Sequence, residues 1–495
     1  MNSAETAITL EEYFSQFRKN IVGIDQEFES PFGRKKIIYT DWTASGRLYR
    51  PIEEKMLNDF GPFVANTHTE TTISGTTMTK SYHVARKIIK KHVNAGQDDI
   101  LITSGTGMTG VINKFQRILG LKLPENLKDC TNIPDEKRPV VFVSHMEHHS
   151  NQTSWLETIA KVEVIPACER GLICLDSFGD LLEKYKDHTL KFASVTSCSN
   201  VTGIQTPYHE IAKMMHRNNG VCFVDFACSA PYVDIDMHPE DEESYLDAVF
   251  FSPHKFLGGP GTCGVLIFNL KLYNNMIPDH PGGGTVSWTN PWGEHKYIDN
   301  IEEREDGGTP GFLQVIKAAL AIRLKEQMGS DKIAEREHEL VSYIFSELQG
   351  IPNLHILAEQ HQNRLGVVSF YIDKLHFNLG VKILNDRFGI QTRGGCSCAG
   401  TYGHFLLHVD HQKSLELTDK ITLGELLEKP GWIRMSIHPT TSNAEMKYVC
   451  DSIKTLAANF LEWSEEYTYV KETNEFIHIN AVNAEDALIE GWFSV

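Results

Sequence analysis

The chain has 495 residues, of which 41% are hydrophobic and 23% are charged, as in a folded globular protein and unlike a disordered or fibrous one. Its formal net charge of −18 repels phosphate backbones and anionic lipid headgroups, so neither a nucleic-acid partner nor a membrane partner is expected. The sequence contains no apolar run long enough to span a bilayer and no signal-peptide pattern at its start. We therefore expect a cytoplasmic protein whose ten cysteines are mostly free thiols.

The first predicted helix spans Ser81 to Asn94, where apolar residues recur at helical spacing. Seven short apolar runs rich in β-branched residues follow it and alternate with helical or turn-rich segments. We predict strands at Ile100–Thr103, Val140–Ser144, Val162–Ile165, Phe192–Ser197, Val221–Asp225, Ala248–Ser252 and Gly264–Phe268. Several of them are apolar on both faces, which indicates a mainly parallel sheet covered by helices on both sides.

The rest of the chain predicts a second α/β region. Two long helices, Phe312–Met328 and Ile333–Leu348, lead into it, and Gly329 and Ser330 separate them. Predicted strands and helices then alternate, with strands at Val367–Ile372, Ile390–Arg393 and Ile433–Ile437 and helices at Asn378–Phe388 and Asn443–Phe460. Ser442 and Glu445 have the spacing of a capping box before the last helix.

These elements predict an α/β protein of two domains. We expect an N-terminal segment at 1–20, a large domain at 51–325 with a seven-stranded, mainly parallel sheet, and a smaller α/β domain built from 21–50 and 326–495.

A glycine-rich motif, Gly105-Thr106-Gly107-Met108-Thr109-Gly110, lies between a predicted strand and a helix. Glycines there let backbone N–H groups at the helix N-terminus approach a phosphate. A dinucleotide site would also need an acidic residue at the end of the next strand, but Val140–Ser144 is followed by His145. The motif therefore favours the phosphate of another cofactor over a dinucleotide or a plain tight turn.

Two other strand ends carry residues suited to chemistry. Ser252-Pro253-His254-Lys255 ends a strand before a glycine-rich stretch, and a desolvated lysine at this place could form an imine, although lysines are usually exposed. Asp225 ends another apolar strand, and its carboxylate would need a cation such as a protonated pyridine nitrogen or a structural ion-pair partner. These strand ends are expected to meet where open α/β sheets bind their ligands.

In these and further motifs the chain resembles the class V aminotransferase-like PLP enzymes, specifically the cysteine desulfurase and selenocysteine lyase group. The resemblance runs from about Tyr39 to about Phe460. Its strongest blocks, in chain order, are Glu147-His148-His149-Ser150-Asn151 with Trp155, Ser199-Asn200-Val201-Thr202-Gly203, Val224-Asp225-Phe226-Ala227, Ser252-Pro253-His254-Lys255, Gly308-Thr309-Pro310, Thr392-Arg393-Gly394-Gly395-Cys396-Ser397-Cys398-Ala399 and Arg434-Met435-Ser436. It implies the PLP-dependent transferase fold of type I, pyridoxal 5′-phosphate (PLP) as cofactor and a homodimer.

The resemblance also implies a role for each matching residue. Lys255 would bond to the cofactor and move the Cα proton, Asp225 would hold the pyridinium, and His148 would stack on the ring. Asn200 would reach the phenolate oxygen, Arg434 would bind the substrate carboxylate and Arg393 would support the edge of the site. The phosphate would be bound by Thr106, Gly107, Ser252 and His254, together with Thr309 from the second subunit.

Cys398 follows Arg393 by five residues, the position of the persulfide-forming cysteine of the family that the chain resembles. A thiolate there would take sulfur from cysteine and leave alanine. A zinc site formed with Cys396, His404 and His408 is an alternative, as is inert packing, but C-x-C is tighter than the usual zinc spacing. The reactive thiol is the favoured interpretation, without a metal.

The chain departs from that family in several places. Gly105-Thr106-Gly107 lacks one hydroxyl donor of the usual phosphate turn, and Cys228 replaces a glutamine. Trp42 replaces a smaller residue, which predicts a changed substrate entrance. The 35 residues between Cys398 and Arg434 form a longer interval than usual, which could serve as a lid or as a docking surface for a sulfur acceptor.

The favoured hypothesis is therefore a PLP-dependent enzyme that releases sulfur or selenium from cysteine or selenocysteine, with alanine as the second product and an acceptor protein for the sulfur. One alternative is another class V activity, such as an aminotransferase, an epimerase or a kynureninase-like lyase, for which Cys398 would be dispensable. Another is a sulfur-relay or interaction protein without turnover.

Overall fold

The computed structural model describes residues 8–67, 69–130, 133–481 and 485–494. Contacts within the chain divide it into two compact units. The large unit comprises residues 45–199 and 205–331, and the small unit comprises the chain up to Ala44, Asn200–Ile204 and the chain from Lys332 onward. The domain boundaries expected from the sequence, at 50/51 and 325/326, remain a prediction.

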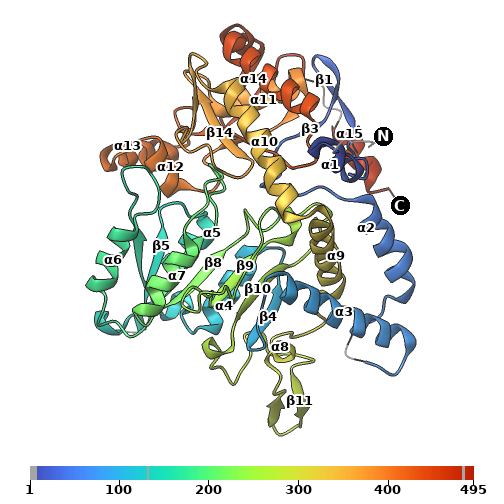
Figure 1. Ribbon diagram of the computed structural model, residues 1–495, viewed down its shortest axis with the longest axis vertical. Helices are drawn as coiled ribbons and strands as arrows, with labels where there is room; N and C mark the ends of the chain where they lie inside the picture. Colours follow the sequence, from blue (N-terminus) through green and yellow to red (C-terminus); the bar gives the residue numbers. More distant parts are fainter. Residues whose placement is uncertain (1–7, 68, 131–132, 482–484, 495) are drawn as a thin grey trace, which may run out of the picture. The chain divides into compact units, whose positions relative to one another are not determined.

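The large unit is built on a seven-stranded sheet in the order β4-β10-β9-β8-β7-β5-β6 (Figure 1). β10 is antiparallel to both of its neighbours, and the other neighbouring pairs are parallel. This confirms the predicted mainly parallel sheet, with every predicted strand end within one residue of the observed one. The strands are β4 (Asp99–Ser104), β5 (Val140–Ser144), β6 (Lys161–Ile165), β7 (Lys191–Thr196), β8 (Val221–Asp225), β9 (Ala248–Phe251) and β10 (Gly264–Asn269).

Helices cover both faces of this sheet, as the doubly apolar strands predict. Val141 and Val143 belong to one core cluster with Trp155, whereas the intervening Phe142 packs edge-on against Phe178 of α6. The helices of the large unit include α2 (Arg50–Lys55), α3 (Ile73–His92), α4 (Met108–Ile118), α5 (His149–Leu156), α6 (Leu175–Lys184), α7 (Tyr208–Arg217), α8 (Ile301–Arg304) and α9 (Phe312–Met328). A hairpin of β11 (Val286–Thr289) and β12 (His295–Tyr297) extends from this unit (Figure 1).

The small unit contains an antiparallel sheet in the order β13-β14-β17-β16, formed by β13 (Leu354–Ile356), β14 (Val367–Ile372), β17 (Trp432–Ser436) and β16 (Arg393–Gly395). β3 (Ile38–Tyr39) pairs in parallel with β15 (Ile390–Gln391). The single strand predicted at Ile390–Arg393 is therefore wrong, because the chain changes sheets at Thr392. Two hairpins complete the strands, β1 (Glu27–Ser30) with β2 (Gly33–Lys36) and β18 (Tyr467–Val470) with β19 (Glu475–His478).

The helices of the small unit pack against these strands around a second apolar core. They are α1 (Leu10–Arg18), α10 (Ser330–Leu348), α11 (Phe377–Phe388), α12 (Gly400–Leu406), α13 (His411–Thr422), α14 (Asn443–Trp463) and α15 (Glu485–Trp492). The Ser442 side chain caps α14 by accepting the Glu445 N–H, which is one half of the predicted capping box, while the Glu445 carboxylate pairs with Arg18. Among the described helices, none is both long and apolar enough to cross a membrane.

Candidate active site

The predicted site residues of the large unit gather at one edge of its sheet. β5, β7, β8 and β9 run parallel, and β4 has the same direction because β10 is antiparallel to both β4 and β9. The carboxyl ends of these strands therefore lie along one edge, where open α/β sheets bind ligands. Asp225 is the last residue of β8, and Gly107, His148 and Lys255 follow the ends of β4, β5 and β9 within a few residues.

A cradle suited to phosphate lies at the N-terminus of α4. The Ser252 hydroxyl accepts the Met108 N–H at 2.8 Å and keeps its own hydrogen to donate. A Cβ at Gly107 would lie 3.0 Å from Ser252 Oγ and 3.3 Å from His254 Nε2, so glycine keeps this space open. Thr106 is exposed beside it. Helix amides, a hydroxyl and an imidazole form a donor set that fits a phosphate.

His254 is held neutral in this cradle. Burial and, to a smaller extent, the charge of the nearby Lys255 amine lower the pKa of its imidazole to about 4. A neutral ring can donate one hydrogen bond to a phosphate oxygen without a second charge.

Asp225 is the buried carboxylate that the sequence predicts. It is 3% exposed, and its Oδ1 accepts the Ala227 N–H at 2.8 Å. Burial raises its pKa to about 6, while the Ala227 hydrogen bond and the charge of the Lys255 amine oppose this rise. A buried carboxylate is costly to ionise when it has no cationic partner. Asp225 is therefore suited to pair with a cationic ring nitrogen. Together with the cradle, Asp225 gives the large unit the donors and the acceptor that PLP needs.

His148 is fixed by its neighbours. Its Nδ1 accepts the Ser150 N–H at 3.1 Å, which caps α5. The preceding Glu147 is 1% exposed and accepts hydrogen bonds from Thr196 N at 2.9 Å and Asn151 Nδ2 at 2.7 Å. Burial raises the Glu147 pKa to about 7. The sequence places Glu147 in a motif without showing its role, although a charged residue directly after an apolar strand indicates such an anchor.

In the small unit, Asp41 brings the two predicted arginines together. Its Oδ1 accepts from Arg434 at 2.7 Å, and its Oδ2 accepts from Arg393 at 3.1 Å. Arg434 is buried on β17 and also donates to the Asn200 carbonyl at 3.1 Å. Sequence reasoning missed Asp41 as a functional residue, although it directly precedes Trp42, one of the positions where the chain departs from the family it resembles.

Two polar atoms in this cluster have capacity left for a ligand. Arg434 Nε and Asn200 Oδ1 are buried and form no hydrogen bond within the part of the chain that the structure describes. Nε is a donor and Oδ1 an acceptor, so they can engage the carboxylate and the amine of an amino acid respectively.

Trp42 packs inside the small unit. It is 4% exposed, its ring stacks on His438 with centroids 4.3 Å apart, and its Nε1 donates to the Tyr39 carbonyl at 3.0 Å. The expectation that this side chain alters a substrate entrance is therefore replaced by a core role.

Cys398 lies in a tight turn that closes through a hydrogen bond from Ala399 N to the Cys396 carbonyl at 3.0 Å. The two central residues, Ser397 and Cys398, have φ values of 48° and 56°, in the left-handed region that favours glycine or asparagine. Such strained residues concentrate at functional sites. The Cys398 thiol is exposed, so the chain holds this nucleophile in solvent reach.

The long interval after Cys398 folds into α12 and α13. His404 on α12 uses both ring nitrogens, with Nδ1 at 2.8 Å from the Gly400 carbonyl and Nε2 at 2.8 Å from Ser414 Oγ. Across the described residues, no three His, Cys, Asp or Glu side chains are grouped as a metal site requires. The zinc alternative for Cys396, Cys398, His404 and His408 thus finds no support in this geometry.

Thr309 is exposed in the large unit. It follows Gly308, whose φ is 86° and whose N–H donates to the Gly283 carbonyl at 2.9 Å. Its predicted contact with a second subunit remains a prediction.

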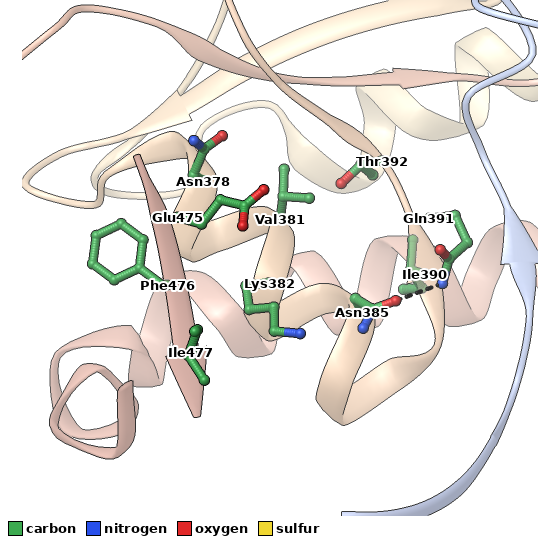
Figure 2. A pocket seen from close by; sticks show the side chains of 10 residues that line it. All are labelled: Asn378, Val381, Lys382, Asn385, Ile390, Gln391, Thr392, Glu475, Phe476 and Ile477. Atoms are coloured by element: carbon green, nitrogen blue, oxygen red, sulfur yellow. Dashed lines mark hydrogen bonds between the residues drawn. The ribbon is translucent and has the colours of Figure 1, made fainter. Parts of the chain in front are cut away.

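A separate cavity of about 410 Å³ lies between α11, β15 and β19 of the small unit (Figure 2). Its walls include Lys382, Gln391, Thr392 and Phe476, and Gln391 Nε2 donates to Asn385 Oδ1 at 2.8 Å. No residue predicted for the site is among its described lining residues, so this cavity is distinct from the candidate site.

Two curated bacterial proteins illustrate the similarity in sequence. A protein of Halalkalibacterium halodurans named "Probable cysteine desulfurase" is 28% identical over 393 residues, covering 78% of this chain and 88% of the relative. A protein of Staphylococcus epidermidis with the same name is 29% identical over 376 residues, covering 75% of this chain and 85% of the relative.

Solved structures show the same fold. A cysteine desulfurase of Thermococcus onnurineus superposes with a TM-score of 0.70 at 22% identity, covering 90% of this chain and 98% of that one. A cysteine desulfurase of Escherichia coli gives a TM-score of 0.69 at 20% identity with the same coverage. The structure therefore has the fold of PLP-dependent enzymes of type I, as predicted. The family model for aminotransferase class-V matches residues 38–449, and the chain belongs to this family.

Proposed function

We propose that the protein is a PLP-dependent enzyme that releases sulfur from cysteine, or selenium from selenocysteine, and leaves alanine. Enzymes of the class V family use PLP, and the sequence relatives are named for cysteine desulfuration. The observation that carries the proposal is the small unit's combination of a carboxylate-binding cluster, Arg434 with Asp41 and Arg393, and an exposed thiol, Cys398, five residues after Arg393.

In the large unit, the roles follow from the surroundings of each residue. The N–H groups at the start of α4, Ser252 and His254 would hold the cofactor phosphate, and Asp225 would stay ionised opposite the ring nitrogen. His148 would cover the ring face. Bound PLP supplies electron withdrawal from the substrate Cα, and the Lys255 amine would hold the cofactor and transfer the Cα proton.

In the small unit, Arg434 would bind the substrate carboxylate with its remaining donor, Nε, while Asp41 keeps the guanidinium in place. Asn200 Nδ2, which gives one of its two hydrogens to the Ser397 carbonyl, would donate the other to the cofactor's phenolate oxygen. The Cys398 thiolate would attack the substrate sulfur and form an S–S bond as the C–S bond breaks, with the electron pair remaining on carbon. Protonation of that carbon gives alanine, and the persulfide on Cys398 passes to an acceptor protein.

The proposal includes a homodimer in which Thr309 of one subunit completes the phosphate site of the other. Its exposure in the single chain leaves it accessible for that contact. α12 and α13 would be the docking surface for the acceptor or a lid, and the cytoplasmic location expected from the sequence remains part of the proposal.

The activity is tested by incubating the purified holoenzyme with L-cysteine and, separately, with L-selenocysteine, and measuring alanine together with sulfide or selenide. We expect equal amounts of alanine and sulfur or selenium, and no product from Lys255→Ala. Transamination or racemisation of another amino acid, with no alanine from either substrate, would establish a different class V activity. No turnover of any amino acid would favour the non-catalytic alternative.

A further inference from the structure

The turn that presents Cys398 also contains a second thiol, Cys396. The two cysteines flank Ser397, and a hydrogen bond from the Ala399 N–H to the Cys396 carbonyl closes the turn. Two Cα–Cα steps of ~3.8 Å, bent by this turn, keep the two Cα atoms close to the ~4.4–6.8 Å span of disulfides. The two thiols also influence each other electrostatically, since the charge of Cys398 acts on Cys396.

The two thiols have different surroundings. Cys398 is exposed, whereas Cys396 is half-buried and donates to the Pro430 carbonyl at 3.3 Å. Burial raises the pKa of Cys396, so at neutral pH it is held as a thiol while Cys398 meets the substrate. Because of this difference, Cys398 is the first nucleophile and Cys396 is a slower second one.

Ser397, between the two thiols, is anchored on both its backbone and its side chain. Asn200 Nδ2 donates to the Ser397 carbonyl at 2.6 Å, and Trp432 Nε1 donates to Ser397 Oγ at 3.2 Å. Since both donors are buried, the middle of the turn stays in place and keeps the two cysteines at a short, fixed separation.

We propose that Cys396 is a resolving thiol for Cys398, which releases sulfide when no acceptor removes the persulfide and thereby switches the enzyme off. This rests on the proposed function, because that activity places the sulfur on Cys398. A reactive cysteine beside a resolving one is a common arrangement in redox-sensitive proteins.

The step balances without an external oxidant. The Cys396 thiolate attacks Cys398 Sγ and forms the Cys396–Cys398 disulfide, while the S–S bond to the outer sulfur breaks and its electron pair leaves on HS⁻. The outer sulfur is reduced to sulfide and the two cysteine sulfurs are oxidised. A dithiol reductant would restore both thiols, so sulfide release would be limited to one event per chain until reduction.

The test is an anaerobic single turnover with holoenzyme in excess over L-cysteine and no reductant. Samples are alkylated and digested with trypsin, and the peptide 394–413, which holds both cysteines, is weighed. For the wild type we expect one alanine and one sulfide for each cysteine consumed, and a peptide about 2 Da lighter than the dithiol with no alkyl group. Cys396→Ser should form alanine but retain about 32 Da of sulfur on Cys398, with free sulfide reduced about tenfold or more.

Two controls keep the result specific. Cys396→Ala should give the same result as Cys396→Ser, which shows that the effect does not come from a folding defect of the serine variant. Cys168→Ser changes another partly exposed cysteine and should behave as the wild type. A persistent persulfide in the wild type, sulfur found on Cys396, or unchanged sulfide release by Cys396→Ser would each overturn the resolving role.

A second arm separates this proposal from the proposed function. Holoenzyme is treated with inorganic tetrasulfide, which loads thiols with sulfur without an amino-acid substrate. If the disulfide forms in this arm while cysteine yields no alanine, the resolving role stands and the desulfurase proposal fails. If cysteine yields alanine and the persulfide persists in both arms, the desulfurase proposal stands and the resolving role of Cys396 fails.

Discussion

Asp225 shows how one buried residue links the fold to the cofactor. Its pKa is raised to about 6 by burial, above the ~3.9 of an unfolded aspartate, so the folded chain binds more protons than the unfolded chain between these values. The contribution of this residue to the free energy of unfolding is therefore fully present below about pH 4 and is lost as the pH rises through about 6.

For the cofactor-free protein, this predicts that Asp225→Asn is more stable than the wild type at pH 7.5, by up to about 3 kcal/mol. The difference should shrink as the pH falls toward 4. Thermal melts of both proteins from pH 4 to 8 check this, and parallel curves would contradict it. In the loaded protein the same variant should bind PLP more weakly, since the ring nitrogen loses its anion.

Asp41 is the residue whose importance emerged from the structure. Replacing it with alanine removes the carboxylate shared by Arg434 and Arg393. We expect kcat/KM for cysteine to fall about tenfold or more, because a buried guanidinium without its partner is poorly placed. Steady-state kinetics with PLP content measured in parallel would show this, and Asp25→Ala, which removes an exposed surface pair with Lys36, should leave kcat/KM unchanged.

At the scale of elements, a buried ion pair ties the cradle helix to the segment before Thr309. Lys114 on α4 lies 2.8 Å from Glu305, and both side chains are almost fully buried. Tyr273 also donates to Glu305 at 2.7 Å. This anchoring fixes the end of the chain segment that leads to Gly308 and Thr309.

Glu305→Ala should accordingly lower the free energy of unfolding by about 3 kcal/mol, because the buried Lys114 loses its nearest carboxylate and keeps only Asp279, 3.6 Å away. The exposed Glu303→Ala is the matched control, expected to change stability by less than about 0.5 kcal/mol. Urea unfolding of the two variants measures the difference, and equal midpoints would refute the anchoring role.

Strand positions in the large unit could be predicted because these strands are short apolar runs bounded by turns. Helix starts were harder, since α3 begins at Ile73 and not at the predicted Ser81. Its first turns contain Thr76 and Thr77 and expose Ile73, so the apolar periodicity is weak there, and the cap at Thr72 defines the start. The change of sheet at Thr392 depends on tertiary pairing, which local pattern does not contain.

For the whole molecule, the central expectation is assembly. The large unit exposes large apolar side chains at Leu57, Ile73, Met276, Ile277 and Trp292, which suits an interface with a second copy. Light scattering should show a dimer, with an interface above about 2,000 Å² in total. Thr309→Val should weaken PLP binding and leave the dimer intact, whereas a monomer with full PLP occupancy would contradict the composite site.

The sequence predicted which residues form the site better than it predicted how those residues are held in place. Strand ends and glycines indicated the cradle, Asp225 and Lys255, because these features are local in the chain. The Asp41 bridge, the anchoring of Ser397 by Asn200 and the hydrogen bonds of Glu147 each join segments far apart in sequence, so local patterns could point to these residues but not to their partners.

The most direct test of the account is the mass of the Cys398 peptide after incubation of the holoenzyme with L-cysteine, compared between the wild type, Cys398→Ala and Cys396→Ser. The account predicts an addition of about 32 Da on the Cys398 peptide of Cys396→Ser, where no resolving thiol removes the sulfur, and a wild-type peptide about 2 Da lighter than the dithiol. Cys398→Ala should keep its PLP and lose alanine release to background. Alanine release by Cys398→Ala at the wild-type rate would contradict the account and leave only a broader class V activity.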